Sequence, residues 1–165
     1  SFPPRRSSDL DEGSQDIVME NNLVYNTKSG GFHQHYGKNN IIQKNIFVNS
    51  RLQQIQATRV EKHTSFIFRN NIISYSTGEL YAGQWDKIII ESGNNIFWNS
   101  AGEQVKIKGK SLEEWQKSGK EKNSIIADPQ FQDPKNFNFN VNESSPALKL
   151  GIDFDFLKIV GPSIK

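Results

Sequence analysis

The chain has 165 residues, of which 35% are hydrophobic and 11% aromatic, so it is long enough to bury a core within one domain. Its formal net charge at pH 7 is +2, and its basic residues are scattered, which argues against nucleic acid as a partner. No run approaches the roughly 18 apolar residues of a membrane span.

The first ten residues, SFPPRRSSDL, do not share the pattern of the rest of the chain. They are polar and basic, and they lack the alternation of a strand. We interpret residues 1–10 as a non-native or disordered arm outside the fold. The sequence therefore predicts a domain that begins near Asp11.

A short pattern recurs four times between residues 17 and 100. A short apolar run is followed by an asparagine, two apolar residues, one further residue, usually a second asparagine, and then Ser or Thr. Self-similarity at a fixed period of this length indicates a solenoid, in which each unit buries its apolar face against its neighbour. The first asparagine of each unit, which we call the pivotal asparagine, occurs at spacings of 23, 26 and 24 residues, at Asn22, Asn45, Asn71 and Asn95.

The residue types inside the repeat indicate which solenoid it forms. The apolar runs are short, rich in Ile, Val and Phe, and bounded by Asn, Gly and Ser, which is typical of strands joined by bends. About three short strands fit one unit, so the sequence predicts a parallel β-helix of about four coils, stacked about 4.8 Å apart. Asparagine tolerates left-handed backbone angles at a bend, and stacked pivotal asparagines would form an amide ladder.

The coils and their strands can be placed along the chain. We assign residues 11–108 to the β-helix, with a Gly30-Gly31 bend before the third strand of the first coil. The expected strands with distinct patterns are 17–20, 23–25, 32–36, 52–58, 80–85, 88–90 and 105–107.

The repeat is expected to stop after residue 108. Ser111 to Gly119 has the pattern of a short helix, with Ser111 as N-cap, Glu114 at the capping-box position and glycine past the end. Leu112 and Trp115 form one apolar edge that would pack on the last coils. We expect residues 109–165 to form this helix and a C-terminal segment of the same domain, whose DPQFQDP stretch caps the open end of the solenoid.

Two long segments, DEGSQDIVMENNLVYNTKSGGFHQHYGKNNIIQKNIF and DPQFQDPKNFNFNVNESSPALKLG, carry a family resemblance. They resemble the C-terminal part of secreted bacterial right-handed parallel β-helix proteins with the pectin-lyase-like fold, and the similarity covers residues 11–162. Those proteins mostly act on polysaccharides, as lyases or glycoside hydrolases. The resemblance implies an all-β right-handed β-helix with a polysaccharide or oligosaccharide partner, located in the periplasm, at the cell surface or outside the cell.

Ionisable residues precede the first strand of successive coils. The segments DEGSQDI and HYGKNNI align on Gly13 and Gly37, which stacks Asp11 on His35. Glu61 holds a comparable place in the next coil. Because alternate side chains of a strand point outward, such a column would form a row on the outer face of the solenoid.

This row predicts a polysaccharide groove in a glycoside hydrolase. The candidate acid and base groups, with a histidine to tune them, are Asp11, Glu12, Glu61 and His35. The candidate sugar contacts offer hydrogen bonds, charge or an aromatic face: His33, Tyr36, Arg59, Tyr81, Gln84 and Trp85. Strand alternation places His33 and His35 on one face, and Phe32, Gln34 and Tyr36 on the other.

The spacing of the carboxyls favours one stereochemical outcome. Two coils separate Asp11 from Glu61, a rise of about 9.6 Å at the strand spacing. Inverting glycosidases hold their carboxyls roughly 6.5 to 9.5 Å apart, and retaining enzymes about 5 to 5.5 Å. The spacing therefore favours inversion.

Other interpretations stay open. A polysaccharide lyase needs a base and a cation for the uronate carboxylate, and a glycan-binding or structural β-helix module needs no catalytic group at all. Arg59, Glu61 and His63 also fit a surface charge cluster. His33 and His35 have no evident third ligand, so we expect no metal, no cofactor and no obligate protein partner.

Overall fold

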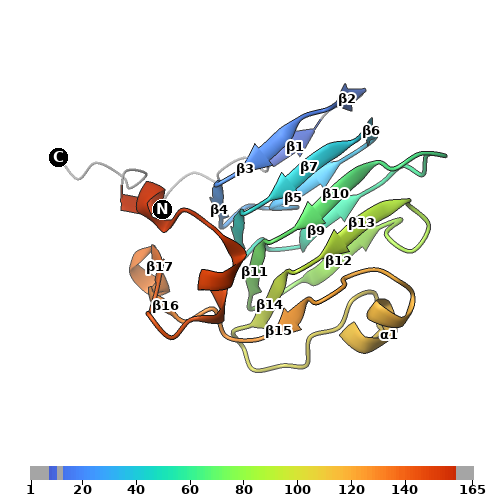
Figure 1. Ribbon diagram of the computed structural model, residues 1–165. Helices are drawn as coiled ribbons and strands as arrows, with labels where there is room; N and C mark the ends of the chain where they lie inside the picture. The colour runs from blue at the N-terminus through green and yellow to red at the C-terminus, as the bar shows by residue number, and fades with distance from the viewer. Residues whose placement is uncertain (1–7, 11–12, 159–165) are drawn as a thin grey trace.

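A computed structural model describes residues 8–10 and 13–158, and these form a parallel β-solenoid of about four coils (Figure 1). The predicted all-β coil architecture is therefore confirmed. Its three main sheets run along the stack, and successive coils contribute one strand to each. Two further two-stranded pairs, β2 with β6 and β16 with β17, lie outside these sheets.

Each of the three main sheets contains only parallel neighbours. The first has the order β1-β5-β9-β12, with bounds Ser8–Leu10, Phe32–Gln34, Gln53–Ala57 and Glu79–Gly83. The second has the order β3-β7-β10-β13, with bounds Val18–Glu20, Asn40–Gln43, Phe66–Arg69 and Ile90–Gly93. The third has the order β4-β8-β11-β14-β15, with bounds Leu23–Tyr25, Ile46–Val48, Ile72–Tyr75, Ile96–Asn99 and Ile125–Ile126.

The coil register follows the asparagine spacing. Ile46 pairs with Leu23 on one side and with Ile72 on the other, and Ile72 pairs with Ile96. The bend before each of these strands uses a left-handed residue, but this is the residue before the pivotal asparagine rather than the asparagine itself. These bend residues have φ between 53° and 56°: Asn21, Lys44, Asn70 and Asn94.

The pivotal asparagines form the predicted ladder. Asn45 donates from its main-chain N–H and from Nδ2 to Oδ1 of Asn71, at 3.0 and 3.1 Å. Asn22 donates in the same way to Asn45, and Asn71 donates to Asn95. The last three pivotal asparagines are fully buried, so the ladder satisfies polar groups that have no access to water.

The N-terminal part of the chain differs from the sequence prediction in two ways. Ser8–Leu10, expected to belong to an arm outside the fold, forms strand β1, which pairs with β5. Strand β2, Ser14–Gln15, pairs with β6, Gly37–Lys38, so that Ser14 and not Gly13 lies opposite Gly37. The alignment on the shared glycine was therefore wrong by one residue.

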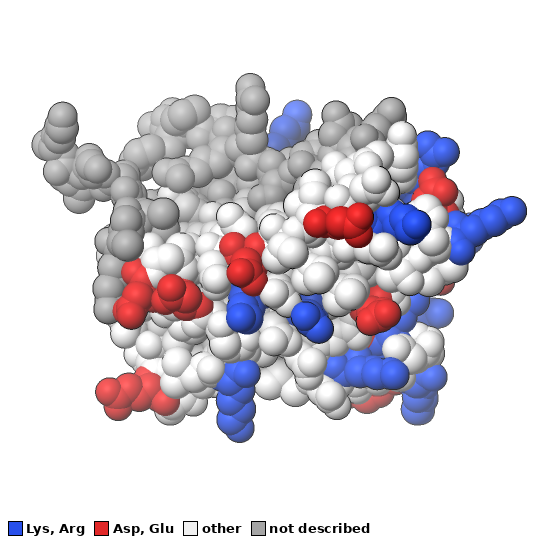
Figure 2. Space-filling view, turned by 45° about the horizontal axis from the view of Figure 1, so that its top comes forward, with Lys and Arg blue, Asp and Glu red and all other residues white. Residues whose placement is uncertain are grey.

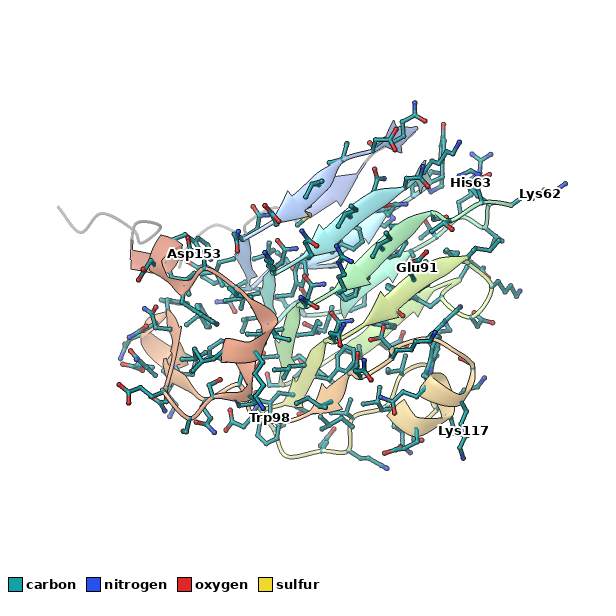
Figure 3. The ribbon with its side chains drawn as sticks, viewed as in Figure 1. Lys62, His63, Glu91, Trp98, Lys117 and Asp153 are labelled. Carbon is teal, nitrogen blue, oxygen red and sulfur yellow. The ribbon has the colours of Figure 1, made fainter. Side chains whose placement is uncertain are left out.

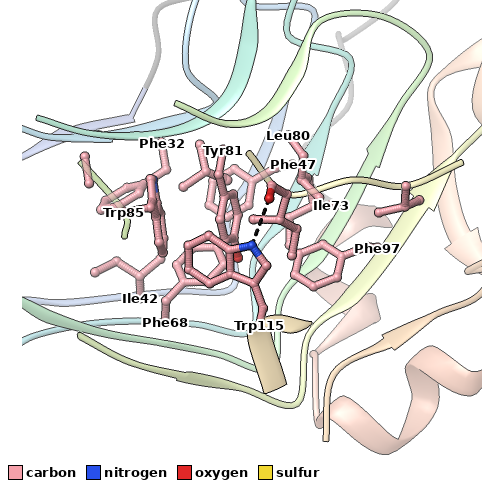
Figure 4. Packing of buried hydrophobic residues seen from close by; sticks show 14 of the residues in the cluster. Phe32, Ile42, Phe47, Phe68, Ile73, Leu80, Tyr81, Trp85, Phe97 and Trp115 are labelled. Atoms are coloured by element: carbon pink, nitrogen blue, oxygen red, sulfur yellow. Dashed lines mark hydrogen bonds between the residues drawn. The ribbon is translucent and has the colours of Figure 1, made fainter. Parts of the chain in front are cut away.

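The helix of the C-terminal part matches its prediction closely. Helix α1, Leu112–Lys117, begins after Ser111, whose hydroxyl accepts from the Glu114 N–H, while Glu114 Oε2 accepts from the Ser111 N–H at 2.7 Å. Trp115 lies in the core and donates from Nε1 to the Ile107 carbonyl at 2.8 Å (Figure 4). The expected strand at 105–107 is absent among the described strands, and Ile107 forms only an isolated bridge with Lys110.

The solenoid continues beyond α1, contrary to the expected end of the repeat. Strand β15 pairs with β14, and Lys122 bridges to Gly93. In this partial coil Ser124 takes the place of a pivotal asparagine, and its hydroxyl accepts from the Asn95 N–H at 3.0 Å. The helix and its flanking loops are thus inserted between two coils.

The ladder ends on a buried carboxyl group that the sequence did not identify. Glu121 is fully buried, and its Oε2 accepts from Asn95 Nδ2 at 2.9 Å and from Ser124 Oγ at 2.8 Å. Its other oxygen accepts from the Tyr81 hydroxyl at 2.8 Å. Glu121 therefore supplies the acceptor in the following coil for Nδ2 of the last asparagine, which also donates to the Phe68 carbonyl.

The tail does not cover the end of the solenoid as expected. It contains a β-hairpin of β16, Phe131–Asp133, and β17, Asn138–Val141, and three 3-10 turns, Pro134–Asn136, Pro146–Leu150 and Phe154–Lys158. Figure 1 shows it beside the third sheet. Its Phe139 and Leu150 pack on Ile46, Ile72 and other side chains that this sheet turns outward. The tail goes there because this sheet, unlike a solvated one, has apolar residues on both faces.

The buried carboxyl should make stability depend on pH. Burial raises the pKa of Glu121 above its usual range, against the opposing effect of hydrogen bonds from Asn95 and Ser124. A carboxyl with a raised pKa contributes stability that is fully present below its unfolded value of about 4.3 and is lost as pH rises through the folded value.

We therefore expect the urea midpoint of unfolding to fall as pH rises above about 4. Glu121→Gln, which mimics the protonated group, should remove that part of the dependence. Parallel urea titrations across this pH range test the difference between the two proteins. Identical pH profiles for both proteins would contradict the assignment.

Candidate functional site

The candidate site lies where strands β5 and β9 end. His33 and His35 share the outer face, as predicted, while Phe32 and Gln34 are buried. His33 Nε2 lies 3.3 Å, and His35 Nδ1 2.9 Å, from the hydroxyl oxygen of Thr58 in the next coil. Two imidazoles therefore converge on one hydroxyl group, and the parallel pairing of β5 with β9 fixes their positions.

Three further residues extend this site. The guanidinium carbon of Arg59 lies 4.4 Å from the centroid of the Tyr36 ring, and Arg59 Nε lies 2.9 Å from Oε1 of Glu61. His35 meets the edge of Tyr36, with ring centroids 5.6 Å apart. We call the resulting group the β5–β9 cluster: His33, His35, Tyr36, Thr58, Arg59 and Glu61.

The members of the cluster do not form the column that the sequence predicted. The N–H of Thr58 donates to the Gln34 carbonyl and that of Arg59 to the His35 carbonyl. The neighbour of His35 in the next coil is therefore Thr58, and Glu61 reaches the cluster through Arg59. The placement of Glu61 in that column was wrong because it counted residues across bends of unequal length, while the placement of Asp11 falls outside the described residues.

The remaining predicted site residues are Asp11 and Glu12, Gln84, and the aromatic pair Tyr81 and Trp85. Asp11 and Glu12 lie outside the described residues, so their expected distance from Glu61 stays a prediction. Gln84 is half-buried at the end of β12, and its N–H donates to the Ala57 carbonyl at 2.7 Å. It lies one coil beyond Thr58, at the margin of the cluster.

Tyr81 and Trp85 are not available to stack on a sugar. Both are buried in the core, where their rings stack with centroids 3.9 Å apart (Figure 4). The expected strand over 80–85 stops at Gly83, whose φ of 88° turns the chain. A side chain at Gly83 would place Cβ 2.0 Å from the Ala57 carbonyl oxygen. Trp85 lies beyond this turn and packs in the core beside Tyr81.

A depression along strand β12 was not predicted. It has a volume of about 440 Å³, and its walls include the carboxylates Glu79 and Glu103 and the amines Lys106 and Lys108. Burial raises the pKa of Tyr75 in the same wall. Three of these charged residues lie in the loop after β14, which has no repeat pattern, so the sequence offered no signal for them.

Charge is distributed evenly over the visible surface. Figure 2 shows acidic and basic side chains interspersed rather than gathered into one patch. Lys62 and His63 lie on the loop between β9 and β10, away from Asp153 of the tail (Figure 3). In this loop, His63 Nε2 lies 3.1 Å from the Gly37 carbonyl oxygen.

Two features are absent from the described part of the chain. Its His, Asp and Glu side chains include no group of three or more arranged to hold a metal ion. Its single α-helix, α1, is too short to cross a bilayer.

Comparison with known proteins found no relative of this chain. No protein family, curated protein or solved structure matches it.

Proposed function

We propose that this chain is the saccharide-binding part of a carbohydrate-active β-solenoid protein, and that the β5–β9 cluster contacts the polysaccharide. The resemblance of residues 11–162 to pectin-lyase-like β-helix proteins supports the class of ligand. A protein of this kind would meet its ligand in the periplasm, at the cell surface or outside the cell.

The observation that carries the proposal is the convergence of His33 and His35 on Thr58, beside the Arg59–Glu61 pair. Sugar hydroxyl groups both donate and accept hydrogen bonds. Arginine only donates, an ionised carboxylate only accepts, and imidazole and hydroxyl groups do both, so the cluster offers every kind of partner. The side chains of Arg59 and Glu61 are 52% and 23% exposed.

These groups can exchange partners at small cost. An ion pair at the surface is worth about 0 to 1 kcal/mol, so Arg59 and Glu61 can turn from each other to ligand hydroxyls. The backbone of Arg59 is anchored by a coil-to-coil hydrogen bond from its N–H to the His35 carbonyl, which limits the entropy lost on binding. Arg59 covers one face of Tyr36, so hydrogen bonding rather than stacking should dominate affinity.

Affinity electrophoresis against plant and algal polysaccharides tests the proposal. Arg59→Ala should weaken binding about tenfold or more, because a hydrogen bond to a charged group is worth about 1.5 to 3 kcal/mol. Lys62→Ala is the matched control, since it removes an exposed cation outside the cluster and should bind as the parent does. Equal affinity of the two variants, or no retardation by any polysaccharide, would overturn the proposal.

Glycoside hydrolysis is the second candidate function, because Glu79 and Glu103 line one depression. Hydrolysis needs two such carboxyl groups. The same polysaccharides, assayed for new reducing ends with Glu79→Gln and Glu103→Gln, distinguish catalysis from binding alone. Products that absorb in the ultraviolet would instead favour elimination by a lyase.

A further inference from the structure

The β5–β9 cluster contains an arrangement that hydrogen bonding to a ligand does not require. Two ring nitrogens converge on one hydroxyl oxygen, because Thr58 Oγ1 lies 2.9 Å from His35 Nδ1 and 3.3 Å from His33 Nε2. A hydroxyl group has one proton and two lone pairs. Thr58 can therefore donate to only one of the two imidazoles, and the other imidazole donates its own N–H to Thr58 Oγ1.

This asymmetry gives the two histidines different roles. His35 Nδ1 is the nearer nitrogen, so it is positioned to accept the hydroxyl proton. His33 Nε2 then carries a proton and donates to the same oxygen, which stabilises the negative charge that develops there when the hydroxyl proton leaves. A hydroxyl group beside an imidazole that accepts its proton is the arrangement that activates a Ser or Thr nucleophile.

The backbone and the side-chain type hold the Thr58 hydroxyl in place. Strand β9 ends at Ala57, and the Thr58 N–H donates to the Gln34 carbonyl at 3.2 Å. Threonine is branched at Cβ, so its χ1 angle has few accessible values. Thr58 and both histidines are half-buried, so the hydroxyl group is fixed in position and still open to a ligand.

Arg59 supplies positive charge next to this hydroxyl group. It follows Thr58 in the chain, and its guanidinium lies over the Tyr36 ring, whose edge His35 meets. Its Nε pairs with Glu61, and the terminal nitrogens of the same guanidinium carry its remaining N–H donors. Donors of this kind stabilise the oxyanion of a tetrahedral acyl-transfer intermediate.

We propose that Thr58 is a nucleophile that removes O-acyl groups from the saccharide bound at the β5–β9 cluster. The inference rests on the proposed function for its substrate, and it adds an ester hydrolysis that binding alone does not need. An ester fits this site because the departing saccharide oxygen can take the proton that His35 has accepted.

The reaction balances with water as its only co-reactant. Thr58 Oγ1 forms a bond to the acyl carbon as its proton passes to His35 Nδ1. The bond between the acyl carbon and the saccharide oxygen breaks, and that oxygen takes the proton from His35. Water then attacks the acyl-threonine, with His35 taking one of its protons and returning it to Thr58 Oγ1 as the carboxylic acid leaves.

4-Nitrophenyl acetate is a suitable probe because it needs no polysaccharide. We expect the full chain to release 4-nitrophenol and to carry an acetyl group on the peptide that contains Thr58, detected by mass spectrometry after acid quenching. Thr58→Val keeps the shape of the side chain but removes its hydroxyl, and it should abolish this adduct. Thr58→Ser should retain the adduct, and Thr77→Val, at an exposed bend outside the cluster, should behave as the parent does.

His35→Gln tests the assigned base. It should slow acetylation of Thr58 about a hundredfold or more, because general base catalysis contributes factors of about 10² to 10⁴. No acetylated Thr58 peptide in the parent, or equal rates of 4-nitrophenol release for the parent and Thr58→Val, would overturn the inference.

The same experiments separate this inference from the proposed function. Retardation of the chain by a polysaccharide without acetylation of Thr58 would overturn the inference and leave the proposed function standing. Acetylation of Thr58 without retardation by any polysaccharide would support the nucleophile and overturn the proposed function.

Discussion

Replacing Glu121 with alanine should lower the free energy of unfolding by about 3 kcal/mol. The substitution removes the acceptor for three donors, on Tyr81, Asn95 and Ser124, in a fully buried site. Each buried polar group left without a partner costs about 1 to 3 kcal/mol, and water entering the space would recover part of that. Urea denaturation followed by circular dichroism measures the loss.

Glu121→Gln is the matched control for this prediction. The amide keeps an oxygen that can accept from Asn95 and Ser124, and its Nε2 can donate to the Tyr81 hydroxyl. We expect a loss below about 1 kcal/mol at pH 7, where the parent protein also bears the cost of burying a charge, and a larger loss near pH 4, where it does not. Equal destabilisation by alanine and glutamine would show that the ladder does not depend on this acceptor.

Asn71→Leu should destabilise the fold by a comparable amount, about 3 kcal/mol, because it interrupts the ladder at its centre. Asn71 accepts from the N–H and Nδ2 of Asn45 and donates from Nδ2 to the Ile42 carbonyl at 3.0 Å. Leucine is close in size but can replace none of these bonds, so the neighbouring groups stay buried and unpaired.

Asn22→Leu provides the comparison within the same ladder. Asn22 is exposed, and its N–H can still donate to Asn45 Oδ1 after the substitution. The expected loss is about 0.5 kcal/mol, typical of surface positions. Similar unfolding midpoints for the two variants would contradict a ladder whose interior carries the stability.

The repeat was predictable because the same physical requirement recurs in every coil. Each coil needs a short apolar strand, a bend and an internal amide, so four similar segments of the sequence all indicate the same coil structure. The residues at the ends of the solenoid meet different structural requirements. Their pattern is not repeated along the chain, so self-similarity cannot reveal it. Nothing in the sequence around Glu121 distinguishes it from an exposed charged turn, although the unmet donors of Asn95 required some acceptor.

The candidate site was predictable only where strand alternation held. His33 and His35 lie within or next to a regular strand, so their shared outer face followed from its period. Tyr81 and Trp85 share one face, but the sequence did not reveal that this face is the one turned toward the core. The depression at Glu79 and Glu103 depends on a loop whose path no local pattern determines.

The most direct test of the central claim is a hydrogen-exchange footprint of the full chain with a bound oligosaccharide. The oligosaccharide would be prepared from whichever polysaccharide retards the chain in electrophoresis. Our account predicts increased amide protection within residues 33–36 and 56–61, at the β5–β9 cluster, and little change on β7 and β10. Protection confined to the loop 99–109, or a bound state without protection at the cluster, would contradict it.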